Sequence, residues 1–239
     1  MKAVRLSIYQ QTANYRIPNH YSVRLSYPLP PFSTVIGMIH TACGFKEYHA
    51  MDVSIQGSYA SEHIDLNTGY SFNGGAFDET RHQLKIKGKE KDIGICRGLL
   101  RTHILNDVNL IIYIHPEKEE DIELIANALK DPDKFLSLGR HEDLVRIDYV
   151  DIVDMDHADE DLDYDFKEYA YVPAEEYEGE FAGTLYNLGK KFAYDKNGTR
   201  IWESKINAAY SNQVPLCIDN VFVDHKNKNI AIFSWMTHH

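Results

Sequence analysis

The chain has few cysteines. Its 239 residues include three, Cys43, Cys96 and Cys217, which stand far apart and are odd in number. Such a set argues against a disulfide framework, and it lacks the close ligand pairs of a structural zinc site. We therefore expect a protein of a reducing compartment. As a separate expectation, the chain needs no metal and no other cofactor.

Long apolar runs are also missing. No stretch approaches the roughly 20 residues that a membrane-spanning helix needs. The first residues, MKAVRLSIYQQ, alternate between apolar and polar and do not form the apolar block of a signal peptide. Both absences predict a cytoplasmic protein with no membrane contact. A hydrophobic content of 44% still permits a sizeable core, as one large domain or as a domain with a satellite.

A net positive charge is lacking too, because the formal net charge is −11. Residues 1–115 carry 12 Lys and Arg against 9 Asp and Glu, a net of +3, whereas residues 116–239 carry 13 against 27, a net of −14. A phosphate backbone is bound by local cations and not by the charge of a whole molecule. We expect any basic face in the N-terminal half, while the acidic half is suited to repel the wrong nucleic acid or to meet a basic partner.

Hydrophobic periodicity predicts an α+β protein. Alternation over Lys2–Tyr9 is typical of a half-buried strand, and apolar positions three and four residues apart predict a helix over 117–130, which Pro132 blocks. The other expected elements are a helix at 33–43 and strands at 53–60, 100–104 with 109–115, and 144–153. A turn is expected at Asn106-Asp107, within the third strand. This βαββαβ order is that of a ferredoxin-like (RRM-like) domain.

Three further regions are expected outside this core. Residues 62–98 contain several Gly and Asn residues that favour turns, and they predict a β-hairpin arm inserted between the second and third strands. The acidic run at 151–168 lacks the glycine turn and terminal glutamate of a calcium loop, so a solvated linker is favoured. Several β-like runs follow, split by Asn-Gly and Asn-Lys-Asn turns. We expect a ferredoxin-like domain at 1–155, a linker at 156–179 and a β-rich subdomain at 180–239.

The segment YPLPPFSTVIGMIHTACG, residues 27–44, couples a stiff proline run to an abrupt helix start. Ser33 or Thr34 is expected to cap a helix that ends at Gly44. The free N–H groups and the positive end of the helix dipole at such a start suit a phosphate. The alternative is a plain strand-to-helix corner whose apolar side chains fill the core.

This segment, together with FLSLGRHEDLV at 135–145, resembles the fifth CRISPR-associated (Cas) protein family. Members of that family are RAMP-superfamily subunits of type I (I-B-like) Cascade surveillance complexes. The resemblance implies a noncatalytic subunit that holds the 5′ handle of the crRNA in antiviral defence. It also implies the repeating backbone subunit and the large subunit as partners, with target DNA held by the assembled complex.

On this resemblance, the handle site consists of the loop before the first helix and the turn at Gly139. We expect close backbone passage at Gly139, where glycine permits a tight approach, and a phosphate grip by Arg140 through paired donors. Glu142 and Asp143 have the wrong charge for RNA and are expected to position the arginine or to cap. The other residues expected to contact RNA here are Arg24, Ser33, Thr34 and His141.

A basic ribbon lies in the predicted arm. Lys85, Lys87, Lys89 and Lys91 occupy every second position, so an extended strand would project their ammonium groups from one face. The resemblance implies an arm that meets the guide RNA and the backbone subunit, and we expect Lys85, Lys87 and Lys89 to track the RNA strand. The alternative is an exposed hairpin that its lysines keep soluble.

Two other functions stay open. The chain has 12 histidines, and metal-independent RNA cleavage needs a base and an acid that histidine can supply. A repeat-RNA endoribonuclease would use His20, Tyr21 and His141. The second alternative is a protein-interaction module that works through the acidic C-terminal half.

Overall fold

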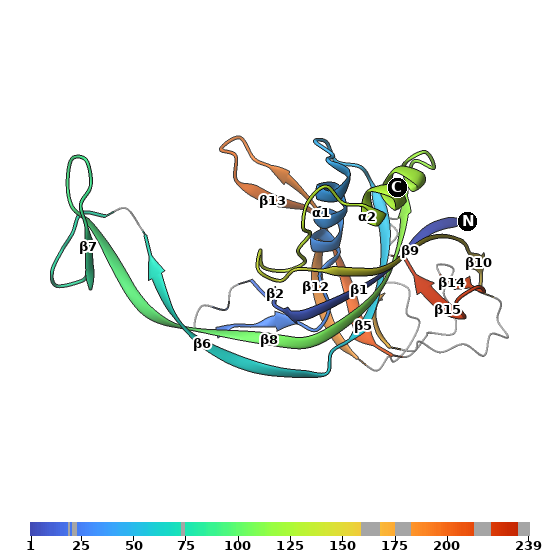
Figure 1. Ribbon diagram of the computed structural model, residues 1–239, viewed down its shortest axis with the longest axis horizontal. Coiled ribbons are helices and arrows are strands. Elements are labelled where there is room, and N and C mark those ends of the chain that lie inside the picture. Colours follow the sequence, from blue (N-terminus) through green and yellow to red (C-terminus); the bar gives the residue numbers. More distant parts are fainter. Residues whose placement is uncertain are drawn as a thin grey trace.

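The computed structural model describes residues 1–18, 20, 23–72, 75–158, 168–174, 183–212 and 221–233. Within these residues, two helices accompany a ten-stranded, mostly antiparallel β-sheet (Figure 1). The centre of this sheet has the strand order β5-β8-β1-β9, with each strand antiparallel to its neighbour. These strands are β1 (Lys2–Ala13), β5 (Met51–Ser58), β8 (Ile93–Pro116) and β9 (Arg146–Asp154).

Two helices cover one face of this central sheet. Alternation along β1 buries Val4, Leu6 and Ile8 on that face, where they pack against α1 (Phe32–Cys43) and α2 (Asp121–Lys130). The apolar positions predicted for the second helix are buried, because they form one stripe at helical spacing. This layer of helices on strands contains the main hydrophobic core.

Both helix starts differ from the predictions. Helix α1 begins at Phe32, with Pro31 as its N-cap and no side-chain capping bond, so the prediction that Ser33 or Thr34 caps it is wrong. The proline carbonyl accepts the Thr34 N–H at 2.9 Å, which places both hydroxyl residues inside the first turn. Helix α2 begins at Asp121 and not at 117, since β8 extends to Pro116 and the Glu117 N–H still donates to the Ala50 carbonyl beside it.

A long arm, formed by the strand from Ser61 to Ser71 and the first part of β8, extends from the sheet (Figure 1). The turn predicted at Asn106-Asp107 is wrong, since β8 runs without interruption through both residues. Asp107 has a φ of 52°, and its carboxylate accepts a hydrogen bond from the Tyr9 hydroxyl at 2.6 Å. The unusual backbone conformation in this part of the strand is therefore that of Asp107. Ser58 pairs with Asn109 and Ser61 with Asn106, so β5 and β6 (Ser61–Ser71) follow β8 in one shared register. Strand β7 (Leu84–Ile86) pairs with β8 in the outer arm.

Three later strands widen the large sheet beyond β5. The order there is β12-β13-β11-β5, from β11 (Tyr169–Pro173), β12 (Thr184–Tyr194) and β13 (Arg200–Ser211). The second and third of these form a hairpin that passes beside α1 (Figure 1). Residues 159–167 and 175–182 of the acidic region lie outside the described residues, and β10 (Asp156–His157) and β11 lie within 156–179.

A small second sheet packs on the face of the large sheet that the helices leave open. It consists of β10, β14 (Val221–Asp224) and β15 (Asn229–Ile232), and its Phe222 contributes to a core with Tyr113 of β8. Buried polar groups of β5 join the two sheets, because the Ser54 hydroxyl accepts the Ile232 N–H at 3.1 Å. No helix among the described residues has the length and apolar character that crossing a bilayer requires.

Candidate nucleic-acid interface

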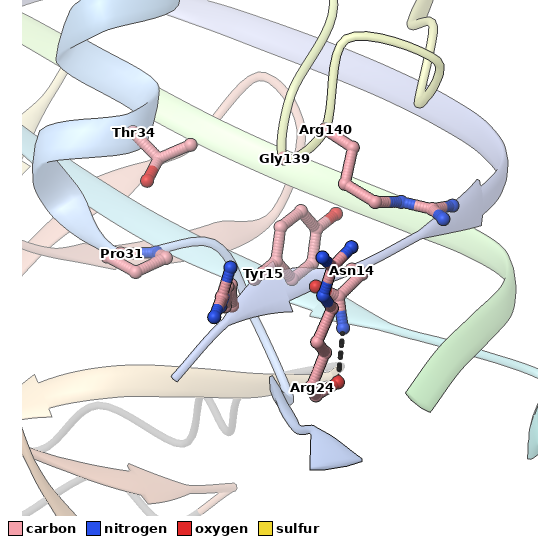
Figure 2. Close-up of a pocket in the computed structure, with 8 residues that line it drawn as sticks. Asn14, Tyr15, Arg24, Pro31, Thr34, Gly139 and Arg140 are labelled. Carbon is pink, nitrogen blue, oxygen red and sulfur yellow. Dashed lines mark hydrogen bonds between the residues drawn. The ribbon is translucent and has the colours of Figure 1, made fainter. Parts of the chain in front are cut away.

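Four segments, one of them more than 100 residues from the others, meet around one pocket of about 290 Å³ (Figure 2). They are the end of β1 with β2 (Tyr15–Arg16), the short β3 (Val23–Arg24), the start of α1 and the loop after α2. The residues that line the pocket are Asn14, Tyr15, Arg16, Arg24, Pro31, Thr34, Gly139 and Arg140. The structure therefore brings together Arg24, Thr34, Gly139 and Arg140 of the predicted site.

Three arginines give the pocket its charge. Arg16 is exposed, and Arg24 and the Arg140 side chain are partly exposed. Among the described residues, neither Arg16 nor Arg24 forms an ion pair, so no carboxylate neutralises either guanidinium. Figure 2 shows Thr34 and Arg140 on either side of Tyr15. A cavity with these donors and no lining carboxylate is suited to an anion such as a phosphate group.

A buried carboxylate orients Arg140. The Asp143 side chain, in a residue only 1% exposed, accepts Arg140 Nε at 2.9 Å and Nη2 at 2.6 Å. Glu142 Oε1 lies 3.1 Å from Nη1, so both acids hold the arginine, as the sequence predicts. The hydrogen bond to Asp143 is the main reason that the pKa of Arg140 is raised above its ordinary value. A guanidinium has five N–H donors, which leaves two that these contacts do not use.

Gly139 is required by the packing of its own loop. Its φ is +110°, which side chains rarely adopt, and an added Cβ would lie 2.9 Å from the Asn14 carbonyl oxygen. We expected close backbone passage of a ligand here, and the nearest atoms belong to the end of β1 and to Asp143. The glycine thus lets the loop approach β1 closely enough for the Asn14 N–H to donate to Asp143 at 3.0 Å.

Asn14 connects the pocket to the base of the arm. Its side-chain amide donates to the Arg24 carbonyl at 3.0 Å and to the His103 carbonyl of β8 at 2.6 Å. Beside it, the buried Tyr15 donates its hydroxyl to Gln10 Oε1 at 2.7 Å, and burial raises the pKa of this hydroxyl well above its ordinary value. Strand β3 pairs with β8, with Arg24 opposite Thr102, so the pocket lies where the arm leaves the sheet.

Sequence reasoning missed Arg16 and Asn14. A usable signal existed for Arg16, because Arg16 and Arg24 flank one short loop that contains Pro18. Asn14 had no such signal, since its role depends on β8 and the Asp143 loop, which are more than 80 residues away. A short polar residue at the end of a strand is too common to single out.

The other predicted residues do not line the pocket. Ser33 lies next to Thr34 in α1, partly buried. The His141 side chain is 98% exposed, with Nδ1 2.9 Å from Glu142 Oε2, and His20 is also exposed. Tyr21 lies outside the described residues.

The lysine ribbon is shorter than its sequence pattern predicts. Strand β7 ends at Ile86, so Lys89 and Lys91 lie in an irregular segment and share no strand face with Lys85. All four lysines are exposed, but Lys85 also pairs with Asp92 at 3.4 Å and lies 5.2 Å from the centre of the Phe77 ring. These lysines lie toward the far end of the arm from the pocket (Figure 1).

No group of three or more His, Cys, Asp and Glu side chains in the described part of the chain is arranged to hold a metal ion. The pocket itself presents three guanidinium groups, which donate hydrogen bonds to anions and repel cations, and no carboxylate lines it. Such a lining suits an anion better than a cation.

The chain is similar to known CRISPR-associated proteins. A family model described as CRISPR-associated protein (Cas_Cas5) matches residues 3–199. A chain of a solved structure titled "CRISPR RNA-guided surveillance complex" is 17% identical with a TM-score of 0.57, and the match covers 89% of this chain and 91% of that one. A CRISPR protein from Archaeoglobus fulgidus is 9% identical with a TM-score of 0.46, over 97% and 99% of the two chains. No curated protein sequence matches the chain.

Proposed function

The chain belongs to the Cas5 family of CRISPR-associated proteins, and from this membership we propose that it is the noncatalytic subunit of a type I (I-B-like) Cascade surveillance complex that holds the 5′ handle of the crRNA. The observation that carries the proposal is the convergence of Arg16, Arg24 and Arg140 on one pocket at the start of α1. The pocket holds a phosphate of the handle, with the Thr34 hydroxyl as a further donor.

The fold supports this assignment at a finer level. We infer a ferredoxin-like RAMP domain from the strand order β5-β8-β1-β9 and from the two helices that pack together on one face. The division into this domain at 1–155, an acidic linker at 156–179 and a β-rich subdomain at 180–239 stays a prediction.

The arm supplies the contacts with partners. In the proposed complex it extends along the guide RNA toward the backbone subunit, and Lys85, Lys87 and Lys89 face the RNA strand. The large subunit is the second partner, and target DNA is held by the assembly. The exposed apolar residues of the arm support a surface that another molecule covers; they include Ile64, Leu66, Tyr70, Phe72 and Leu99.

A gel shift with labelled cognate repeat RNA in EDTA tests the proposal. Arg140→Ala is expected to weaken binding about ten-fold or more, because hydrogen bonds to charged groups contribute about 1.5–3 kcal/mol. Arg146→Ala is the matched control, since Arg146 is exposed and pairs with Asp148 at 2.6 Å outside the pocket. Equal affinities of wild type and Arg140→Ala would overturn the proposed site.

The same RNA on a denaturing gel separates the two alternatives. A discrete cut that His20→Ala or His141→Ala abolishes would favour the endoribonuclease. Intact RNA with no affinity even at low salt, combined with binding to another subunit, would favour the protein-interaction module.

A further inference from the structure

The outer half of the β12–β13 hairpin extends beyond the body of the protein (Figure 1). Its base is fixed, because the buried Lys190 ion-pairs with Asp52 of β5. Next to it, Lys191 pairs with Glu203 at 2.7 Å and lies 5.1 Å from the centre of the Tyr48 ring. The segment from 192 to 202 therefore projects from a rigid root.

Large aromatic side chains are exposed on this segment. Tyr194 is 68% exposed and packs edge-on against Phe192, with ring centres 5.5 Å apart, while Trp202 is 43% exposed. Trp202 lies against the backbone of Gly189: a Cβ placed there would be 2.4–2.6 Å from three neighbouring atoms of its six-membered ring. The indole therefore turns one flat side to the hairpin, while part of its surface stays exposed to solvent.

The hairpin has a net positive charge, although the C-terminal half of the chain in which it lies is acidic. Residues 189–205 carry five Lys and Arg against two Asp and Glu, a net of +3, within a half whose net charge is −14. Lys196 and Lys205 are exposed and form no ion pair among the described residues. Exposed cations beside exposed rings are the combination that binds single-stranded nucleic acid, whose bases stack and whose phosphates need cations.

Hydrogen bonds within the turn define the tip of the hairpin. The Asp195 carboxylate accepts the N–H groups of Asn197 at 2.9 Å and Thr199 at 2.7 Å, and Gly198 has the φ of +75° that the turn requires. A rigid turn holds the two strands and their rings in place, so little conformational entropy is lost on binding.

This hairpin is separate from the arginine pocket. The pocket lies at the start of α1, whereas Lys191 contacts Tyr48, which follows the end of that helix. A helix of 12 residues is about 18 Å long, so the two surfaces are separated by roughly that distance.

We propose that the outer β12–β13 hairpin is a second surface for single-stranded RNA, in which Trp202 and Tyr194 stack on bases and Lys196 and Lys205 contact phosphates. The choice of RNA over DNA rests on the proposed function. The surface itself rests on the rings and charges of the hairpin.

Tryptophan fluorescence tests the stacking directly. The chain has two tryptophans, so Trp235→Phe leaves Trp202 as the single reporter. Titration of the full chain with an oligouridylate of about ten nucleotides is expected to quench this fluorescence. In fluorescence anisotropy with the same labelled RNA, Tyr194→Ala and Trp202→Ala are each expected to weaken binding about ten-fold.

Matched variants separate stacking from damage to the fold. Tyr194→Phe keeps the ring and should bind as the wild type does. Gly189→Ala should weaken binding by displacing Trp202, and Lys196→Ser with Lys205→Ser should lower the salt dependence without touching the rings.

Several results would overturn the proposal. One is the absence of quenching together with equal affinities of wild type and Trp202→Ala. Tighter binding of oligothymidylate than of oligouridylate would assign the surface to DNA, and self-association that Trp202→Ala abolishes would assign it to protein. The proposed role of the arginine pocket is tested by a different experiment, the binding of repeat RNA to Arg140→Ala. That substitution leaves the hairpin unchanged, so the two proposals can fail independently.

Discussion

At the scale of single residues, the Asp143 carboxylate holds the candidate site together. It accepts hydrogen bonds from the Arg140 side chain, the Arg140 backbone and the Asn14 backbone while it is buried. Buried carboxylates are stable only when such donors surround them. The site is therefore sensitive to a change that removes its charge and hardly alters its shape.

Asp143→Asn is expected to lower the free energy of unfolding by about 2 kcal/mol, because an amide cannot replace the charged hydrogen bonds to Arg140. Urea denaturation measures this change. Glu142→Gln is the control, since that carboxylate is half-exposed and its loss should cost less than about 1 kcal/mol. Equal stabilities of the two variants would contradict the role assigned to Asp143.

Gly139→Ala is expected to destabilise the protein by about 1–3 kcal/mol, since alanine is strained at a φ of +110° and its Cβ would meet the Asn14 carbonyl. Gly37→Ala is the matched control. Gly37 lies in α1 with open space where a Cβ would be added, so alanine should stabilise the helix by up to about 1 kcal/mol. Thermal denaturation that ranks the two variants in the opposite order would disprove this account.

His40 gives the stability a pH dependence. Burial lowers its pKa below the ordinary value of 6.5, so the unfolded chain binds the proton more readily than the folded one. Its contribution to stability is complete above 6.5 and is lost as the pH falls from there toward the folded pKa. Between about pH 7.5 and 5.5, the wild type should therefore lose more stability in urea titrations than His40→Gln. Equal losses would exclude His40 as a source.

At the scale of elements, periodicity predicted strands and helices better than it predicted their ends. The alternation of β1 and the helical stripe of α2 are local patterns, and the structure confirms both. The cap of α1 and the turn at Asn106-Asp107 were wrong for one reason. Ser, Asn and Asp favour caps and turns locally, but the Pro31 carbonyl accepts the first N–H groups of α1, and strand pairing carries β8 through Asn106 and Asp107.

The arm illustrates the same limit. Its position between β5 and β8 was predictable from the length of the insertion, whereas the straight pairing of β6 along β8 depends on a register that no local pattern encodes. The lysine ribbon was predicted from alternation alone, and the irregular segment after Ile86 ends that alternation.

Lysines of the arm should differ in their effect on RNA binding. Replacing Lys87, Lys89 and Lys91 with serine is expected to weaken binding and to reduce the salt slope by about 0.7 for each phosphate that is no longer neutralised. Lys85→Ser should reduce the slope less than any of these three substitutions, since Asp92 already neutralises part of the Lys85 charge. A salt titration of repeat-RNA affinity measures the slope, and an unchanged slope in the triple variant would remove the arm lysines from the interface.

At the scale of the whole molecule, segments that are remote in sequence come together to form the candidate site. Arg24, Thr34 and Arg140 were singled out on a resemblance, and the structure brings them into one pocket. The small sheet of β10, β14 and β15 could not be predicted, because its packing on β8 pairs residues that are more than 100 positions apart. Long-range burial of that kind leaves no periodic signature beyond that of an ordinary strand.

Removal of residues 213–239 is expected to cost more than about 3 kcal/mol or to abolish cooperative unfolding, because it deprives the buried Ser54 and Gln56 of their β15 partners. Removing only His238 and His239 is the control and should leave the transition unchanged. Calorimetry distinguishes these outcomes, and an intact cooperative transition in the longer truncation would show that the small sheet is dispensable.

The shared register of β5 and β6 along β8 limits how the arm can change length among relatives. Each strand rises by about 3.4 Å per residue, so two residues added to both strands would extend the arm by about 7 Å and keep both of its faces. A single residue added to one strand would turn every side chain beyond it to the opposite face. Arms of related chains should therefore differ in even steps, and an odd step should coincide with a bulge.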